Sequence, residues 1–126
     1  MKKVLAVMSD LFFSAKINDA AKKLGMTAVF VKDNAVAIEH LKLNPALVIF
    51  DLNCTSAEPL ALIKAMKENP ATASIGTVGF ISHVQTDLKR KAEDAGCDTV
   101  VARSVFAQNL TAILEHYVSQ QVHEGA

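Results

Sequence analysis

Short apolar runs alternate with amphipathic stretches along most of the chain. The runs cover 3–8, 27–31, 46–50, 75–81 and 99–102, and they have the length and residue types of strands. The run 46–50 reads ALVIF and is followed by a single carboxylate, Asp51. Consecutive apolar residues of this kind are typical of a strand that is buried on both faces. The pattern therefore predicts a parallel sheet, with Asp51 at its carboxyl edge.

Between these runs, apolar residues recur at helical spacing, and local signals mark where the helices begin and end. Asp10 can cap the first helix, and Asp33 or Asn34 can cap the second. Gly25 and Gly96 follow two of the helices, as C-capping glycines do. The expected helices cover 11–24, 33 or 34 to about 43, 55 or 56 to a break at 68–72, 86 or 87 to 95, and a final segment that includes 106–117.

Five strand–helix pairs in 126 residues predict an α/β fold with helices on both faces of a parallel sheet. A β/α barrel needs about 250 residues. We therefore expect a flavodoxin-like, doubly wound (βα)5 domain with strand order 2-1-3-4-5. The domain is expected to span 1–122, with a frayed end at 123–126. Because this strand order reverses between the first and third strands, the loops 9–11 and 51–56 should flank any site.

Composition and charge narrow the possible functions. The chain has 13 basic and 13 acidic residues, so no basic field favours nucleic acid or a membrane surface. Its first apolar run is too short for a signal-peptide core or a membrane span. Two cysteines form no disulfide framework, which favours a reducing, cytoplasmic location. No glycine-rich phosphate loop, metal-ligand spacing or nucleophile elbow is present, so we expect neither a cofactor nor an enzymatic activity.

Four positions carry a resemblance to a known family. Asp51 lies in the sequence IFDLN, Ser82 ends the fourth strand, the turn AGCD precedes the fifth strand, and Arg103 follows it. In these positions, and over nearly its whole length, the chain resembles the receiver domains of response regulators. The resemblance implies that Asp51 is the phospho-acceptor position and that the backbone carbonyl of Asn53 faces a Mg²⁺ ion. It also implies that Ser82 and Arg103 are switch-position residues.

The chain departs from the receiver pattern at positions that matter for phosphoryl transfer. Met8 and Ser9 stand where the family has two adjacent carboxylates, and Asp10 follows one residue late. Val100 stands at the aromatic switch position of the fifth strand, and His83 replaces the small residue that follows the switch hydroxyl. Aspartyl phosphorylation needs a divalent cation to neutralise the phosphoryl oxygens. The departures therefore weaken the metal site that the resemblance implies.

These departures favour an atypical receiver, a pseudo-receiver, that binds partners without being phosphorylated. The Mg²⁺ ligands that remain are Asp10, Asp51 and Asn53, a thin set for an ion that requires near-octahedral oxygen ligation. Arg103 replaces the Lys of the family, and its planar fork suits a carboxylate, so we expect a direct Asp51–Arg103 pair. Two alternatives stay open: a phospho-acceptor receiver of a two-component phosphorelay that uses Asp51, Asp10 and Mg²⁺, and a small-anion sensor built from Asp51, Ser82, His83 and Arg103.

The resemblance also implies a surface for partners. In the family, the fourth helix, the fifth strand and the fifth helix contact a signalling partner or a second copy. We expect a fixed surface here, because Val100 removes the usual aromatic rotamer. We also expect a stand-alone domain of bacterial-type signal transduction, without an output domain in the chain. The predicted partner face consists of Lys89, Arg90, Glu93, Asp94, Val100, Ala107 and Gln108.

Overall fold

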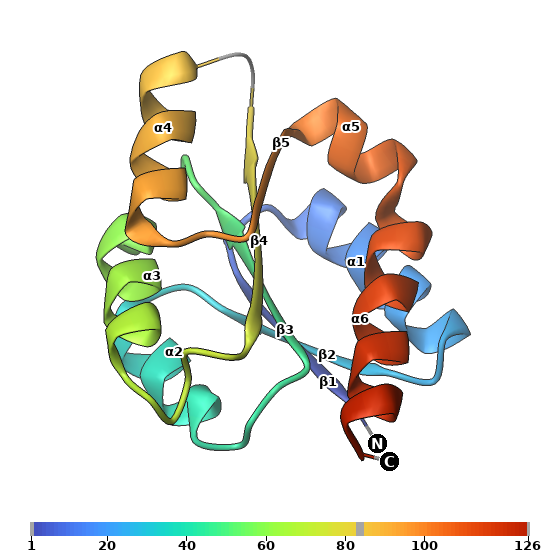
Figure 1. Ribbon diagram of the computed structural model, residues 1–126. Coiled ribbons are helices and arrows are strands. Elements are labelled where there is room, and N and C mark those ends of the chain that lie inside the picture. Colours follow the sequence, from blue (N-terminus) through green and yellow to red (C-terminus); the bar gives the residue numbers. More distant parts are fainter. Residues whose placement is uncertain (1, 83–84, 126) are drawn as a thin grey trace.

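Strands and helices alternate in the order that the apolar pattern predicts (Figure 1). The computed structural model describes residues 2–82 and 85–125, with side chains up to 118. Within these residues the strands are β1 (Lys3–Val7), β2 (Thr27–Val31), β3 (Leu47–Asp51), β4 (Gly76–Ile81) and β5 (Thr99–Ala102). The helices are α1 (Leu11–Lys23), α2 (Asn34–Leu41), α3 (Pro59–Glu68), α4 (Thr86–Ala95), α5 (Arg103–Gln108) and α6 (Leu110–Gly125). The domain boundary expected at residue 122 stays a prediction, and His83 lies outside the described residues.

The strands form one parallel sheet in the order β2-β1-β3-β4-β5. β1 lies between β2 and β3, with Leu5 paired to Val29 on one side and to Val48 on the other. This order confirms the predicted flavodoxin-like, doubly wound topology. Because the sheet order reverses at β1, the carboxyl ends of β1 and β3 lie side by side at one edge.

Different helices cover the two faces of the sheet. In Figure 1, α1, α5 and α6 lie to the right of the sheet, and α2, α3 and α4 lie to the left. Side chains alternate along β1, so that Val4, Ala6 and Met8 enter the core beneath α1 and α6. Leu5 and Val7 enter the core beneath α2, α3 and α4. Burial on both faces explains why the strands appear in the sequence as continuous apolar runs.

Aspartates cap the first two helices as predicted. The side chain of Asp10 accepts a hydrogen bond from the Phe13 amide at 3.0 Å, and that of Asp33 accepts one from the Val36 amide at 2.9 Å. Each carboxylate thereby satisfies one of the amides that an N-terminal helical turn leaves without an intrahelical partner. The cap at Asp10 also fixes the loop that leads from β1 toward the carboxyl edge of the sheet.

The start of α3 differs from the expectation. α3 begins at Pro59, whose fixed φ suits a first helical position, and no side-chain hydrogen bond caps it. The predicted cap at Thr55 or Ser56 is therefore wrong. Ser56 instead donates its hydroxyl to the backbone carbonyl of Lys32 at 2.6 Å, which ties the loop after β3 to the loop after β2.

The last helical segment is broken where one continuous helix was expected. α5 ends at Gln108, and α6 begins at Leu110. Between them, Asn109 donates its side-chain amide to the carbonyl of Val105 at 2.9 Å. Asparagine side chains compete in this way with the helical backbone and favour helix ends. The break lets α5 cover the carboxyl end of β5 while α6 runs back along the sheet, as Figure 1 shows.

Glycines within β4 allow close packing on both faces of the sheet. A side chain at Gly76 would collide with the ring of Tyr117, and a Cβ at Gly79 would lie 2.8 Å from a methyl carbon of Leu52. Glycine in a strand interior commonly marks such a close approach. None of the helices in the described part of the chain combines the length and apolar character that a membrane span requires.

Candidate functional site

The sheet brings the predicted site positions to one edge. Asp51 ends β3, and Asn53 lies in the loop that follows it. Asp10 follows β1, Ser82 follows β4, and Arg103 follows β5. Because all five strands run in parallel, these residues leave the sheet at the same carboxyl edge. The topology therefore places them together as the sequence predicts, and the side-chain contacts decide what they do.

Arg103 pairs with Asp10 rather than with Asp51. The guanidinium Nη2 of Arg103 donates to Oδ2 of Asp10, and no ion pair joins Arg103 to Asp51 among the described residues. The guanidinium carbon also lies 4.6 Å from the centre of the Phe13 ring, a cation–π geometry. The predicted Asp51–Arg103 pair is therefore wrong. The ring of Phe13 holds the guanidinium over the first turn of α1, where Asp10 is the carboxylate within reach.

The Phe13 ring beneath the Arg103 guanidinium is part of a cluster of aromatic rings. The ring centroid of Phe13 lies 4.9 Å from that of Phe80 and 5.7 Å from that of Phe106. Phe80 and Phe106 are stacked with their centroids 5.2 Å apart. All three rings are almost fully buried. Because Phe13 is wedged in this cluster, the ring beneath Arg103 has little freedom to move.

Both carboxylate oxygens of Asp10 have partners. Oδ1 accepts from the Phe13 amide, and Oδ2 accepts from Arg103. The Phe13 amide, followed by the Arg103 guanidinium, holds the pKa of Asp10 below its ordinary value. Asp10 is thus a charged helix cap and ion-pair partner, and a metal ion would have to displace one of these contacts to use it.

Asp51 is half-buried, and its charge is disfavoured. Burial raises the pKa of its carboxyl, whereas the Asn53 amide and the Arg103 charge partly oppose that rise. The only hydrogen bond to this carboxylate within the described residues comes from the Asn53 amide, at 3.0 Å to Oδ1. Asp10, whose negative charge is nearby, adds to the rise. The net effect of these surroundings is to disfavour the ionised form of Asp51, although the Arg103 charge acts in the opposite direction.

Neither Met8 nor Ser9 supplies a carboxylate at this edge of the sheet. The thioether of Met8 is 1% exposed and packs in the core beneath α1, and Ser9 is exposed. Among the described residues, no group of three histidine, cysteine or acidic side chains is arranged to hold a metal ion. Mg²⁺ prefers carboxylate and water oxygens. Of the expected ligands Asp10, Asp51 and Asn53, the Asp10 carboxylate is engaged by the Phe13 amide and by Arg103.

The side chain of Asn53 links two loops of the site, a role that the sequence analysis missed. Its Oδ1 accepts from the backbone amide of Ser82 at 2.8 Å and from the Ser82 hydroxyl at 3.1 Å. Its Nδ2 donates to Oε1 of Gln85 at 2.9 Å. The Ser82 hydroxyl is thus linked to Asp51 through Asn53. An amide two residues after Asp51, together with a serine at the end of β4, was the available signal.

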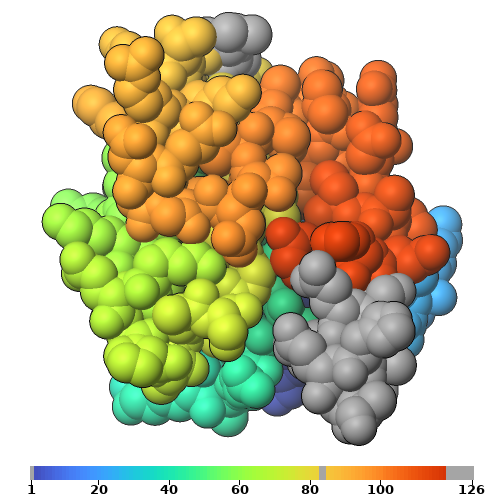
Figure 2. Space-filling view, viewed as in Figure 1, coloured from blue at the N-terminus to red at the C-terminus, as the bar shows by residue number. Residues whose placement is uncertain are grey.

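The predicted partner face lies on α4, β5 and α5. Figure 2 shows the orange surfaces of α4 and of the segment from β5 into α5 adjoining on the side that faces the viewer. Val100 is only 8% exposed, and it lines a cavity of about 300 Å³ together with Ile81 and Val105. Ala107 is half-buried and packs on the core beneath α1. The exposed members of the face are Lys89, Arg90, Glu93, Asp94 and Gln108.

Comparisons with known proteins agree with this fold. No model of a known protein family matches the sequence, and no curated protein matches it. Among solved structures, the phosphorylated cyanobacterial phytochrome response regulator RcpA is 20% identical, with a TM-score of 0.82 over 94% of this chain and 95% of that chain. A response regulator from Hahella chejuensis is 22% identical, with a TM-score of 0.83 over 93% of this chain and 95% of that chain. The Mn²⁺-bound form of response regulator Rcp1 is 16% identical, with a TM-score of 0.77 over 90% and 91%.

The chain thus has the fold of response-regulator receiver domains. The similarity extends over almost the full length of the compared structures. A shared fold supports many functions, and the chemistry at the edge of the sheet depends on the particular side chains there. At this edge, the side chains of Met8, Asp10 and Arg103 determine which chemistry is possible.

Proposed function

We propose that this chain is a degenerate response-regulator receiver, a pseudo-receiver, that acts as a phosphorylation-independent protein–protein interaction module in signal transduction. The observation that carries the proposal is the engagement of Asp10. This carboxylate caps α1 with one oxygen and binds Arg103 with the other. It is also the acidic residue closest to the position of the missing acidic pair. The chain thus uses the acidic residue nearest to that position for structure.

The surroundings of Asp51 support the same proposal. Transfer of a phosphoryl group to a carboxylate requires the ionised nucleophile and a cation that neutralises the phosphoryl oxygens. Burial raises the pKa of Asp51, so its surroundings oppose the ionised form. The buried thioether of Met8 supplies no ligand of the oxygen type that Mg²⁺ prefers. The Met8 thioether therefore makes the requirement for a cation harder to meet, and burial of the Asp51 carboxylate acts in the same direction.

A fixed surface fits a module that binds without switching. The Asn53 side chain ties the loop after β3 to Ser82 and Gln85 ahead of α4. Arg103, the first residue of α5, is held by Asp10 and by the Phe13 ring. The elements that flank the partner face are therefore anchored at their ends, and Val100 has no large ring to reorient.

Phosphorylation is tested with a small phosphodonor, Mg²⁺ and intact mass spectrometry. We expect no phosphoryl adduct on the natural chain, and the same result for an Asp51→Asn control. A stoichiometric adduct that disappears in Asp51→Asn would establish the phospho-acceptor alternative instead. That alternative draws support from the position of Asp51 at the sheet edge and from the similarity to the phosphorylated regulator RcpA.

A gain-of-function variant sharpens this test. Ser9 is exposed, so Ser9→Asp adds a second carboxylate after β1 without burying a charge. Combined with Arg103→Lys, which removes the guanidinium fork from Asp10, it should create measurable Mg²⁺ binding by calorimetry. Arg103→Lys alone is the matched control and should bind no more Mg²⁺ than the natural chain. Equal binding by all three chains would mean that the absent acid is not what limits the site.

The partner face is tested by crosslinking. A photoreactive amino acid at position 89, which is exposed on α4, should capture a partner or a second copy. The same probe at the exposed Lys16 of α1 is the control and should capture neither. Because binding is proposed to be independent of phosphorylation, Asp51→Asn should leave the crosslink unchanged. Loss of the crosslink in Asp51→Asn would instead link binding to the acceptor position.

A further inference from the structure

A hollow between α2 and α3 forms a cavity of about 550 Å³ on the left-hand layer of the fold. Two residues that line it, Asn44 and Thr72, precede β3 and β4, so the cavity opens toward the amino edge of the sheet, away from Asp51. Within the described residues, α3 approaches α4 closely, whereas α2 and α3 approach each other much less. The gap between α2 and α3 is therefore incompletely filled by the chain itself.

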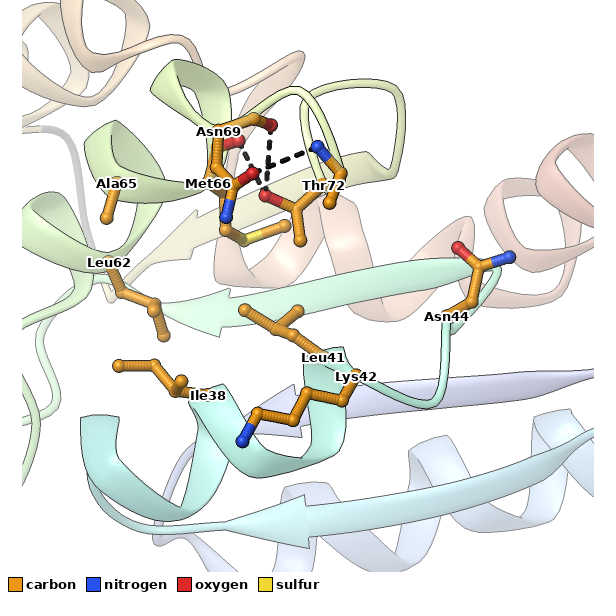
Figure 3. Close-up of a pocket in the computed structure, with 10 residues that line it drawn as sticks. Ile38, Leu41, Lys42, Asn44, Leu62, Ala65, Met66, Asn69 and Thr72 are labelled. Carbon is orange, nitrogen blue, oxygen red and sulfur yellow. Dashed lines mark hydrogen bonds between the residues drawn. The ribbon is translucent and has the colours of Figure 1, made fainter.

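The interior of this cavity is apolar. Figure 3 shows the side chains of Ile38 and Leu41 on α2 pointing across the gap toward Leu62 and Met66 on α3. Leu62 and Met66 are almost completely buried, whereas Ile38 at the mouth is 46% exposed. Leu43, just after α2, is 57% exposed. Protein interiors contain few voids larger than a water molecule, and exposed apolar patches beside a cavity often mark binding sites.

Several polar groups at the rim offer hydrogen-bond donors. Among the described residues, Lys42 is the one charged residue that lines the cavity, and its ion pair with Glu39 is weak because both side chains are about two-thirds exposed. Asn69 uses its Oδ1 for the Ala71 amide at 2.9 Å, which leaves its NH₂ group as a donor. The side-chain amide of Asn44 has no partner in the described part of the chain. A cation and amide donors around an apolar interior favour a ligand with an apolar body and an anionic head.

We propose that this cavity binds a small amphipathic carboxylic acid. Its apolar body lies against Ile38 at the mouth, over the buried side chains of Leu41, Leu62 and Met66, and its carboxylate lies at the rim beside Lys42. The volume is within the range of about 300–1,000 Å³ that is usual for small-molecule sites. Straight-chain and aromatic acids share this chemistry, and the probes below separate them. The site is independent of Asp51, so it does not rest on whether the chain is phosphorylated.

Binding is tested with probes that differ in the head group. Octanoate and 2-naphthoate should give saturable calorimetric binding, with NMR amide shifts confined to α2, α3 and the loops at Asn44 and Asn69. Octan-1-ol has the same tail without the charge and should bind about twofold to fivefold more weakly than octanoate, as expected for one exposed ion pair. Octylamine should bind more weakly still. Preference for octylamine over octanoate, or no saturable response from either acid, would overturn the proposal.

Variants with matched controls localise the site. Ala65 is exposed on α3 and lines the cavity, so Ala65→Phe should fill it and abolish binding of both acids. Ala61→Phe, one turn earlier on the same helix and also exposed, should leave binding intact. Lys42→Gln should weaken octanoate about twofold to fivefold and leave octan-1-ol unchanged. Unchanged octanoate binding by Ala65→Phe would overturn the proposal, as would self-association of the natural chain that Ala65→Phe abolishes, because a protein would then be the occupant.

Discussion

Each end of the sheet holds an aspartate that is paired with a cation, and the two pairs are built differently. At the amino edge, Oδ2 of Asp98 accepts from Lys67 at 3.3 Å, from the Thr77 amide at 2.9 Å and from the Thr77 hydroxyl at 3.2 Å. Thr77 is completely buried. Lys67 also donates to the carbonyls of Ala73 at 3.2 Å and Ile75 at 3.0 Å. The Asp98–Lys67 pair thereby satisfies buried polar groups at the start of β4, among them the Thr77 amide.

The two edges differ in the groups that the pairs hold rather than in exposure, because the Asp98 side chain is itself 47% exposed. At the carboxyl edge, Asp10 and Arg103 hold one helix amide and one aromatic ring. Their side chains are 28% and 35% exposed, respectively. The amide that Asp10 accepts from belongs to the first turn of α1, and the guanidinium of Arg103 rests on a ring. The amino-edge pair therefore stabilises the folded sheet. The carboxyl-edge pair joins only the loop after β1 to the start of α5, and its loss should cost less.

The largest effect is expected at the amino edge. Asp98→Ala leaves the buried Thr77 amide without an acceptor and removes the anion beside Lys67. We expect the free energy of unfolding to fall by about 2–3 kcal/mol, as for other buried donors that lose their partner. Urea denaturation followed by circular dichroism measures this change. Asp98→Asn keeps an acceptor oxygen and should lose less.

Asp10→Ala should destabilise the protein by a smaller amount. It removes an N-cap, which is worth about 1 kcal/mol, and a partly exposed ion pair, which adds about 0.2–1 kcal/mol. Asp10→Asn retains the capping oxygen and loses the negative charge, so it should cost only the ion pair. The same urea titration compares them. If Asp10→Ala proves as damaging as Asp98→Ala, the proposed contrast between the two edges is wrong.

The sequence contains enough information to predict the architecture, because the chain buries both faces of every central strand. Such strands appear as continuous apolar runs, and their alternation with helices leaves few topologies open. The position of Asp51 at the carboxyl edge follows from that topology alone. The break at Asn109 was harder to predict, because it depends on one side chain competing for a backbone carbonyl within an otherwise apolar helical pattern.

The topology did not predict which side chains of the site bind each other. Residues that share an edge are close, but which carboxylate Arg103 reaches depends on the ring of Phe13, and that ring is placed by contacts with Phe80 and Phe106. These three aromatic residues lie far apart in the sequence. Side-chain direction set by tertiary packing is information that residue spacing does not carry. The same limit applies to the Asn53 amide and its contact with Ser82.

Asn53→Ala should lower the free energy of unfolding only slightly, and the structural change should be confined to the carboxyl edge. It removes the acceptor for Ser82 and the donor for Gln85, and neutral hydrogen bonds of this kind contribute about 1 kcal/mol each at most when exposed. The Ser82 amide should exchange its hydrogen faster, which hydrogen-exchange NMR detects. Asn53→Asp keeps the acceptor oxygen and should preserve protection at Ser82. Equal exchange in both variants would show that the Asn53 side chain does not hold the loop.

The smallest expected effect is a gain in stability, from Asp51→Asn. Burial raises the pKa of Asp51 above its ordinary value of 3.8, so the folded protein favours the protonated carboxyl. The stability that this group contributes is complete below pH 3.8 and is lost as the pH rises through the raised pKa. At neutral pH, Asp51→Asn should therefore increase the free energy of unfolding, by less than about 1 kcal/mol, because Asn53 and Arg103 already offset part of the burial.

Asp10 should show the reverse dependence, which makes the two carboxylates of one edge distinguishable. Its pKa is lowered from 3.8, so its contribution is present above that pH and is lost as the pH falls through the lowered pKa. Unfolding measured between neutral and acidic pH should show the gain from Asp51→Asn and the loss from Asp10→Asn both shrinking as the pH falls. A net loss of stability from Asp51→Asn at neutral pH would mean that its contacts with the Asn53 amide and the Arg103 charge outweigh burial. Asp51 would then be a favourable anion at the carboxyl edge, ready to accept a phosphoryl group, and the case for a pseudo-receiver would rest on Asp10 and Met8 alone.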